Sequence, residues 1–191
     1  MWKFDEDTPF VDRTNYGFSV DKVIVLATPE ETKADHYNAK ASSDDADIIL
    51  KLFSEEDWSP YCLAHLFTFQ SFQHSVLGLA YVSSPLPYAI GGICSRPQYR
   101  SNDKALSVNI GLSSYKSASL RQGRLLQREA ELVTAHEFGH NWGSEHDPND
   151  SPCAPDSGSQ GGNFLMYAYS NQGHDRNNDV IFLVCYESIL N

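Results

Sequence analysis

Apolar residues recur along the chain at two different spacings, and each spacing predicts one kind of secondary structure. In residues 44–53 the apolar positions are three and four apart, which places them on one face of a helix. That face carries Ala46, Ile49, Leu50 and Phe53. Ser43, Asp44 and Asp45 precede it and are typical of a helix start. A second, longer helix is predicted over Leu125–Asn141, from the histidine motif that it carries and not from apolar spacing.

Four other segments are rich in apolar, β-branched and aromatic residues and are predicted to be strands. They cover Phe18–Leu26, Cys62–Phe69, Val76–Ser83 and Leu106–Leu112. Gly78 lies inside the third strand, and a glycine in a strand permits close approach by another backbone. Ser84–Arg100 contains three prolines and the pair Gly91-Gly92, so we predict a long loop there.

The predicted second helix carries two histidines, His136 and His140, with Glu137 directly after the first. Residues four apart share a helix face, so both imidazoles can reach one metal ion. Gly143 lies three residues further on and accepts the left-handed conformation that ends many helices. The chain can then turn back and deliver His146 as a third ligand. Three neutral histidines leave zinc an open fourth position, which is the pattern of a catalytic zinc site.

Glu137 is predicted to be the general base of that site. Water in the open position has its pKa lowered to roughly 7. Glu137 can take its proton during attack on a carbonyl and return it to the leaving amine. The zinc would polarise the carbonyl oxygen and hold the negative charge that develops on it.

The alternative is an ordinary amphipathic helix with solvated histidines. A His-Glu-x-x-His pattern alone also occurs by chance on surface helices. Gly143 and His146 at the right offsets favour the metal site instead.

Composition and charge narrow the class of partner. The 191 residues are 41% hydrophobic, 12% aromatic and 20% charged, which is typical of one globular domain with a core. The net charge of −11 argues against nucleic acid and anionic membranes as partners. No apolar run approaches the roughly 20 residues of a membrane span. The start of the chain does not form a signal peptide, because it lacks a basic region and an apolar core.

The stretch His-Glu-Phe-Gly-His-Asn-Trp-Gly-Ser-Glu-His at 136–146 matches the zinc motif of the metzincin metalloproteases. The following Asp147 resembles the adamalysin (reprolysin) branch, the ADAM family. Met166, within Phe-Leu-Met-Tyr, is similar to the methionine turn that metzincins carry beneath the ligand histidines. Other stretches resemble the TACE-like (tumour necrosis factor-α converting enzyme-like) branch of that family. They lie at 62–70, 77–82, 91–94, 153–155 and 161–163.

The resemblance implies a fold and an activity. The fold would be a metzincin αβα sandwich of the α/β class, with a twisted mixed sheet, an edge strand above a cleft and a zinc-binding helix. The cofactor would be Zn²⁺. The activity would be that of a zinc-dependent endopeptidase that cleaves membrane-anchored proteins just outside the membrane (ectodomain shedding). Its partners would be protein and peptide substrates, and it would lie at the cell surface as part of a type I membrane protein.

The resemblance also implies substrate-binding residues. In metzincins the edge strand pairs antiparallel with substrate, which assigns Leu77, Gly78 and Leu79 to substrate binding. A plain core strand is the alternative. Ala168 and Tyr169 follow the methionine turn, where the family forms the wall of the pocket for the residue after the cleaved bond. Members of the TACE-like branch often have proline in place of Ala168, so the resemblance fixes neither the shape nor the selectivity of this pocket.

The family domain opens with a strand and a long helix before the strand that matches Phe18–Leu26. We find neither in this sequence. We therefore interpret residues 1–191 as a single metalloprotease catalytic domain that is a fragment, truncated at both ends. A non-catalytic remnant that binds zinc or a partner is the alternative, and the amino terminus favours it. The intact histidines and Glu137 favour an enzyme.

The chain has four cysteines, which allow three complete pairings. The expected zinc ligands are histidines, so the cysteines are free to form the disulfides typical of extracellular proteins. The resemblance implies that Cys153 pairs with Cys185. The family partners of Cys62 and Cys94 lie outside this chain. These two are therefore expected to be unpaired thiols, or to be forced into a pairing that the complete domain would not use.

Overall fold

The computed structural model describes residues 2–4, 18–26, 36–38, 43–84, 86, 90–99, 105–117, 123–149 and 161–181. Its helices are α1 (Ala46–Ser54), the short 3₁₀ helix η1 (Gln73–Ser75) and α2 (Gln127–Asn141). Its strands are β1 (Trp2–Phe4), β2 (Phe18–Val20), β3 (Ala64–Thr68), β4 (Gly78–Ala80), β5 (Gln98–Tyr99), β6 (Ala105–Leu106) and β7 (Ile110–Ser114).

The central sheet has three described strands in the order β3-β7-β4. β3 runs parallel to β7, with Ala64 opposite Ile110, whereas β4 runs antiparallel to it, with Leu79 opposite Leu112. The sheet is therefore mixed. Two small antiparallel pairs, β1-β2 and β5-β6, lie apart from it in the topology.

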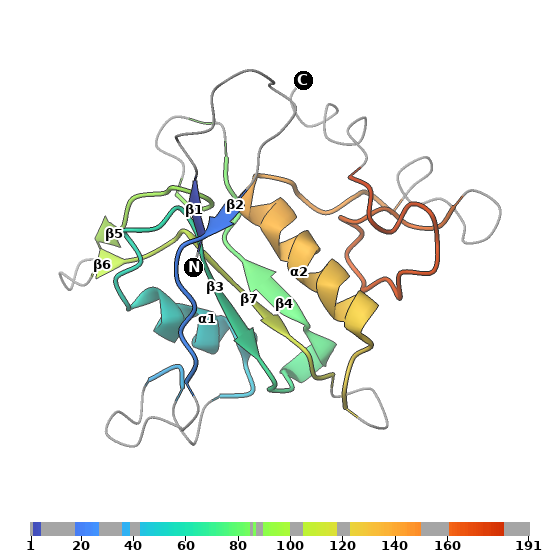
Figure 1. The fold of residues 1–191 in the computed structure, drawn as a ribbon, viewed down its shortest axis with the longest axis horizontal. Coiled ribbons are helices and arrows are strands. Elements are labelled where there is room, and N and C mark those ends of the chain that lie inside the picture. The colour runs from blue at the N-terminus through green and yellow to red at the C-terminus, as the bar shows by residue number, and fades with distance from the viewer. Residues whose placement is uncertain are drawn as a thin grey trace.

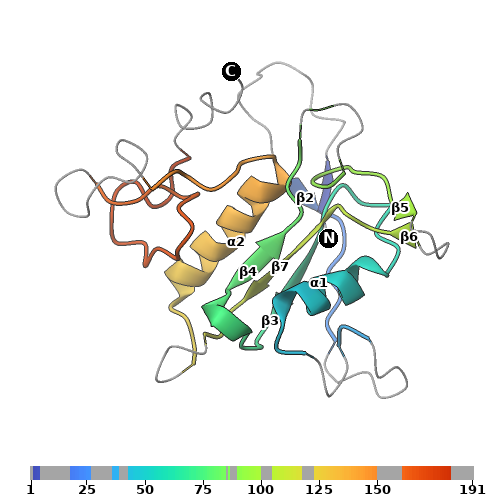
Figure 2. The same cartoon turned by 180° about the vertical axis from the view of Figure 1, so that it is seen from behind.

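The helices α1 and α2 cover opposite faces of this sheet (Figure 1 and Figure 2). Successive residues of a strand point to opposite faces. On β7, Ile110 and Leu112 belong to the apolar cluster beneath α1. Between them, Gly111 faces Asn141 at the end of α2. The layers are helix, sheet and helix.

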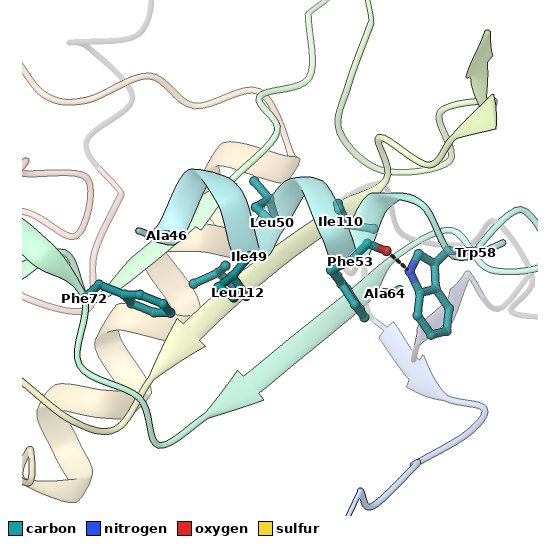
Figure 3. Packing of buried hydrophobic residues seen from close by; sticks show 9 residues of the cluster. All are labelled: Ala46, Ile49, Leu50, Phe53, Trp58, Ala64, Phe72, Ile110 and Leu112. Carbon is teal, nitrogen blue, oxygen red and sulfur yellow. Dashed lines mark hydrogen bonds between the residues drawn. The ribbon is translucent and has the colours of Figure 1, made fainter. Parts of the chain in front are cut away.

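The larger apolar core lies between α1 and the sheet (Figure 3). α1 contributes its whole apolar face, and β3 and β7 contribute residues that are fully buried. The cluster contains Ala46, Ile49, Leu50, Phe53, Trp58, Ala64, Phe72, Ile110 and Leu112. Trp58 ends the packed region: its indole N–H donates to the carbonyl of Phe53 at 2.8 Å.

α1 forms where the spacing of apolar residues predicts a helix. Asp45 is its N-cap, and its carboxylate accepts a hydrogen bond from the N–H of Asp47 at 2.9 Å. Such a bond satisfies one of the amide groups that have no partner in the first turn. Lys51 in the last turn adds a favourable interaction with the helix dipole.

The strand predicted over Leu106–Leu112 is wrong in its bounds, because buried polar side chains interrupt it. The amide nitrogen of Asn109 donates to the carbonyls of Trp58 and Tyr61 at 3.1 and 2.6 Å. The hydroxyl of Ser107 accepts from the N–H of Trp58 at 3.0 Å. These bonds tie the chain to the end of the α1 region, and the regular strand β7 begins after them.

The strand predicted over Phe18–Leu26 is likewise shorter in the structure. Only β2 pairs as a strand, antiparallel to β1. Residues 21–26 are described without strand pairing, and Val23 and Val25 are 74% and 81% exposed. The alternation of apolar residues in this segment is therefore not matched by burial among the described residues.

Of the two alternatives expected for Cys62 and Cys94, unpaired thiols are wrong, because the two form a disulfide with each other. That the complete domain would not use this pairing stays a prediction. The backbone brings the two cysteines together: the N–H of Cys94 donates to the carbonyl of Cys62 at 2.7 Å. The turn that carries Cys94 is held in place by Ile93, whose N–H donates to the carbonyl of Asn141 at 2.9 Å. Cys153 and Cys185 lie outside the described residues, so their pairing stays a prediction.

The α/β class, the mixed sheet and the long helix that carries the histidine motif are confirmed. Among the described helices, none has the length and apolar character needed to cross a membrane.

Candidate metal centre

α2 and the turn after it bring three histidines together. His136 and His140 lie one helical turn apart on α2. Gly143 then adopts a positive φ of 98°, and the N–H of Ser144 donates to the carbonyl of Gly139 at 2.9 Å. This closes the helix with a left-handed residue and turns the chain back, so that His146 faces the two helical histidines. The reversal expected at Gly143 is present.

The three imidazoles meet through their Nε2 atoms. The distance from Nε2 of His146 is 3.2 Å to Nε2 of His140 and 3.2 Å to Nε2 of His136. The other ring nitrogen of each helical histidine is held by a backbone carbonyl. Nδ1 of His136 donates to the carbonyl of Leu165 at 2.8 Å, and Nδ1 of His140 donates to that of Ser144 at 2.7 Å.

These hydrogen bonds fix the tautomers, because a carbonyl oxygen can only accept. Nδ1 of His136 and His140 must carry hydrogen, and in the neutral rings Nε2 then carries a lone pair. Burial lowers the pKa of His136 to about 4 and also lowers the pKa values of His140 and His146. All three rings therefore present the neutral form that binds metal.

The arrangement fits zinc. The candidate ligand atoms of His136, His140 and His146 all lie within 4.8 Å of one another. Two nitrogens bound to one tetrahedral zinc at about 2.0–2.1 Å lie about 3.3 Å apart, close to the two measured separations. Carbonyl oxygens that hold the second nitrogen of each ring are the usual supports of zinc-binding histidines.

The segment that contains Met166 lies against the histidine cluster and holds it through backbone carbonyl groups. The Leu165 carbonyl holds His136, and the Met166 carbonyl accepts from the N–H of Asp147 at 2.9 Å. Met166 is fully buried, and a Cβ added to Gly139 would meet its side chain, with Cε at 3.0 Å. The predicted methionine turn therefore packs directly against α2. It contacts the helix at Gly139, which lies between His136 and His140 in the sequence.

Glu137 points from α2 toward β4. Its side chain is buried, with 5% exposed, and its Oε2 has no hydrogen-bond partner among the described residues. Burial raises the pKa of its carboxyl to about 8. A buried carboxyl beside three convergent histidines is the type of group found at catalytic sites.

A cleft of about 670 Å³ runs along the metal centre between β4, α2 and the chain that follows Met166. Every residue that the sequence assigns to substrate binding lines it: Leu77, Gly78, Leu79, Ala168 and Tyr169. The three histidines and Glu137 line it as well. Within the described part of the chain, β4 pairs with β7 alone, so its other edge is available to an extended peptide.

Sequence reasoning missed two features of the cleft. The first is Glu129, which lies in the wall and accepts a hydrogen bond from the hydroxyl of Ser170 at 3.0 Å. Its spacing of seven residues from His136 places both on one helix face and could have identified it. The second is the pair of backbone carbonyls that hold the histidines, which no residue type indicates.

The other described histidines do not join the centre. His65 is buried and hydrogen-bonds through Nε2 to the hydroxyl of Ser113 at 2.8 Å. His36 lies 3.4 Å from the carboxylate of Glu56. His74 and His174 are exposed.

Comparison with known proteins shows what this chain is similar to. A sequence model of the reprolysin-like metallopeptidases of family M12B matches residues 11–189. The disintegrin and metalloproteinase domain-containing protein 17 homolog of Caenorhabditis elegans is 35% identical over 187 residues, which cover 92% of this chain and 27% of that protein. Disintegrin and metalloproteinase domain-containing protein 10 of Xenopus laevis is 32% identical over 185 residues, or 94% of this chain and 24% of that protein. The human protein 10 is 30% identical over 189 residues, or 96% and 24%.

The chain spans about a quarter of the length of these relatives. The match to the family covers nearly the whole chain, and it includes the helix, the histidine cluster and the segment of Met166. The chain therefore belongs to the reprolysin-like metallopeptidases of family M12B, which are zinc-dependent metalloendopeptidases.

Proposed function

We propose that residues 1–191 form a single catalytic domain that hydrolyses peptide bonds, with His136, His140 and His146 as zinc ligands and Glu137 as general base. One observation carries the proposal. Three neutral imidazoles converge through Nε2 at separations of 3.2 Å, and a buried carboxyl follows the first of them on the same helix. On an ordinary surface helix, histidine side chains point into solvent and their Nε2 lone pairs do not converge.

The three histidines would hold the zinc, whose positive charge would activate water, polarise the scissile carbonyl and favour the carboxylate form of Glu137. Glu137 would accept a proton as the water attacks and deliver it to the leaving amine. Its burial excludes solvent from this transfer. The carbonyls of Leu165 and Ser144 hold the rings of His136 and His140 in the orientation that the reaction needs.

The substrate would lie extended along β4. Its main chain would pair with the free edge beside Leu77, Gly78 and Leu79, as in other cases of strand addition. Ala168 and Tyr169 would form part of the wall around the side chain that follows the cleaved bond. Pairing through the main chain supplies affinity with little sequence preference, so the wall would provide most of the selectivity.

We further propose that the domain acts outside the cell, on the ectodomains of membrane-anchored proteins, as part of a larger membrane-anchored chain. The Cys62–Cys94 disulfide supports an oxidising compartment. The proposed Cys153–Cys185 bridge would add a second covalent link after the zinc motif. The names of the relatives, disintegrin and metalloproteinase domain-containing proteins, support a domain within a longer protein.

The test is Glu137→Ala, assayed with a quenched fluorescent peptide beside a zinc determination on the same preparation. We expect zinc to stay bound while the rate falls by roughly 10²–10⁴-fold, because Glu137 is a base and not a ligand. Glu131→Ala, an exposed position on the same helix, is the matched control and should keep full activity. Inhibition of the parent enzyme by a hydroxamate chelator should accompany this result.

Two outcomes would contradict the proposal. Turnover of Glu137→Ala near the parent level would show that Glu137 is not the general base. Stoichiometric zinc in the parent protein without any hydrolysis of a broad peptide library would instead identify a binding module.

A further inference from the structure

Gly78 and Glu137 occupy one place in the structure. A Cβ built on Gly78 would lie 2.6 Å from both Cγ and Cδ of Glu137, and it would come closer still to Oε1. Ordinary contacts of a Cβ begin at about 3.4 Å. The carboxyl group of Glu137 therefore fills the space that any side chain at position 78 would need.

The backbone gives no other reason for a glycine here. Gly78 is in a strand and is not one of the described residues with positive φ. A glycine inside a strand is destabilising relative to alanine when its conformation does not require it. The requirement at position 78 is therefore for space and not for conformation.

The neighbours of Gly78 show the same pattern. Gly78 and Ala80 lie on the same face of β4, the face toward α2, because residues two apart in a strand share a face. Leu79, between them, packs against the core beneath α1. The residues of β4 that face α2 are therefore both small. The side chain of Glu137 is buried against Gly78, the position of β4 that has no side chain.

We propose that Gly78 is a positioning residue, which sets the place of the Glu137 carboxyl and acts on turnover through it. The proposal rests on the proposed function of Glu137 as general base. It differs from the role that the sequence suggests, in which Gly78 lets a substrate backbone approach. The two roles separate in kinetics, because a displaced base lowers kcat whereas a blocked backbone raises KM.

The kinetic test is Gly78→Ala in the full chain, with zinc content, kcat and KM measured on one preparation. We expect zinc to stay bound, KM to stay within about twofold, and kcat to fall about 10- to 100-fold, as for a reacting group misplaced by about 1 Å. A rise in KM with unchanged kcat would overturn the proposal in favour of substrate approach. Parent-like values of both constants would overturn it as well.

A second test measures stability and does not depend on catalysis. Denaturation midpoints are compared for the parent, Gly78→Ala, Glu137→Ala and the double variant. Gly78→Ala should lower the midpoint of the parent, and this loss should vanish when Glu137 is already alanine, because the space is then free. If Gly78→Ala alone fails to fold, recovery of folding in the double variant gives the same answer.

Gly111→Ala is the matched control. It also adds a methyl group to a strand glycine, but its Cβ would meet Nδ1 of His65 at 3.0 Å and Oδ1 of Asn141 at 3.2 Å, not Glu137. Its effect on the midpoint should be the same with and without Glu137→Ala. An equal loss for Gly78→Ala in both backgrounds, or failure of the double variant to fold, would overturn the proposal.

The two tests also separate this proposal from the proposed function. If Glu137→Ala is fully active, Glu137 is not the base, yet the stability cycle still reports whether Gly78 and Glu137 share one space. If Glu137→Ala is inactive and the cycle shows no coupling, the base stands and the positioning role falls.

Discussion

The two helices lie on opposite faces of one sheet, but different kinds of residue hold them there. α1 separates its faces: Ile49, Leu50 and Phe53 are buried, whereas Ile48 on the outer side is 45% exposed. α2 does not. It buries Glu137, His140 and Asn141 along with its apolar residues, and its first turn has no side-chain cap.

The difference indicates that α1 contributes mainly to stability, whereas the contacts of α2 also position the residues of the metal centre. α1 is held by contact between apolar surfaces, which is strong and tolerant of small shifts. α2 is held at its end by directional bonds: Nδ2 of Asn141 donates to the carbonyls of Tyr81 and Ile110 at 3.0 Å each. Directional bonds fix a helix in register, which a site that must gather three histidines requires.

The largest expected effect comes from removing a ligand on α2. His140→Ala should lower zinc affinity more than about 100-fold and abolish peptide hydrolysis, because two histidines cannot hold the ion or orient its chemistry. Zinc titration and a peptide assay measure both. The exposed His174→Ala should change neither. Retention of stoichiometric zinc and turnover by His140→Ala would show that the Nε2 cluster is not the metal site.

The next effect, on the α1 side, should reverse that pattern. Ile49 is 1% exposed in the core of Figure 3, so Ile49→Ala should reduce the free energy of unfolding by about 2–5 kcal/mol. The kcat of the folded enzyme should not change, since Ile49 is not among the residues that line the cleft. Urea denaturation and kinetics check the two parts, with the half-exposed Ile48→Ala as control. A large change in kcat at equal folded fraction would break the division between the helices.

The third prediction concerns the loss of stability at acidic pH. We expect His65, on the face of the sheet toward α2, to cause part of this loss. His65 lies on β3, and its ring packs against Phe138 of α2 with centroids 5.0 Å apart. Burial lowers the pKa of His65 to about 3, whereas the unfolded chain keeps the ordinary value of about 6.5. Its contribution to stability is therefore complete above pH 6.5 and is lost as the pH falls toward 3.

Between pH 7 and pH 5 this linkage should cost about 2 kcal/mol of unfolding free energy. The comparison is with His65→Gln, which keeps the metal ligands and so shares their pH dependence. The parent should lose more stability than the variant over this interval. Parallel pH profiles for the two proteins would mean that His65 does not titrate in this way.

The smallest effect tests the N-cap of α1. Asp45→Ala removes the carboxylate that accepts from the N–H of Asp47 and should cost about 1 kcal/mol of unfolding free energy. α2 has no such side-chain bond at its start, so Leu126→Ala at the corresponding position should cost little. Similar losses at both positions, measured by denaturation, would show that the cap adds nothing beyond local packing.

The sequence predicted the two helices for different reasons. The apolar spacing in α1 is regular, and both its existence and its start follow from that spacing and from Asp45. In α2 apolar and polar residues do not separate into faces, so the histidine motif and not the pattern located it. The convergence of His146 also followed from local chemistry, since Gly143 ends the helix where the spacing required.

What the sequence could not predict depends on contacts between distant segments. The break before β7 results from bonds that Asn109 makes to residues about 50 positions earlier. The Cys62–Cys94 pair depends on a turn held by Asn141. Nothing in the sequence indicated that the side chain of Glu137 occupies the space that a Cβ at Gly78 would need.

The Cys62–Cys94 disulfide has a consequence for how this enzyme would withstand cleavage by other copies of itself. The bond joins residues 32 positions apart, and the covalent ring so closed contains β3, η1 and the cleft strand β4. Ile90 lies within the ring and is 58% exposed, so it is open to a neighbouring enzyme molecule. A single self-inflicted cut there leaves both new ends tied to the same molecule, and β4 keeps its attachment through Cys62 and β3. Nicked and intact enzyme would migrate together on a gel until a reductant separates the pieces.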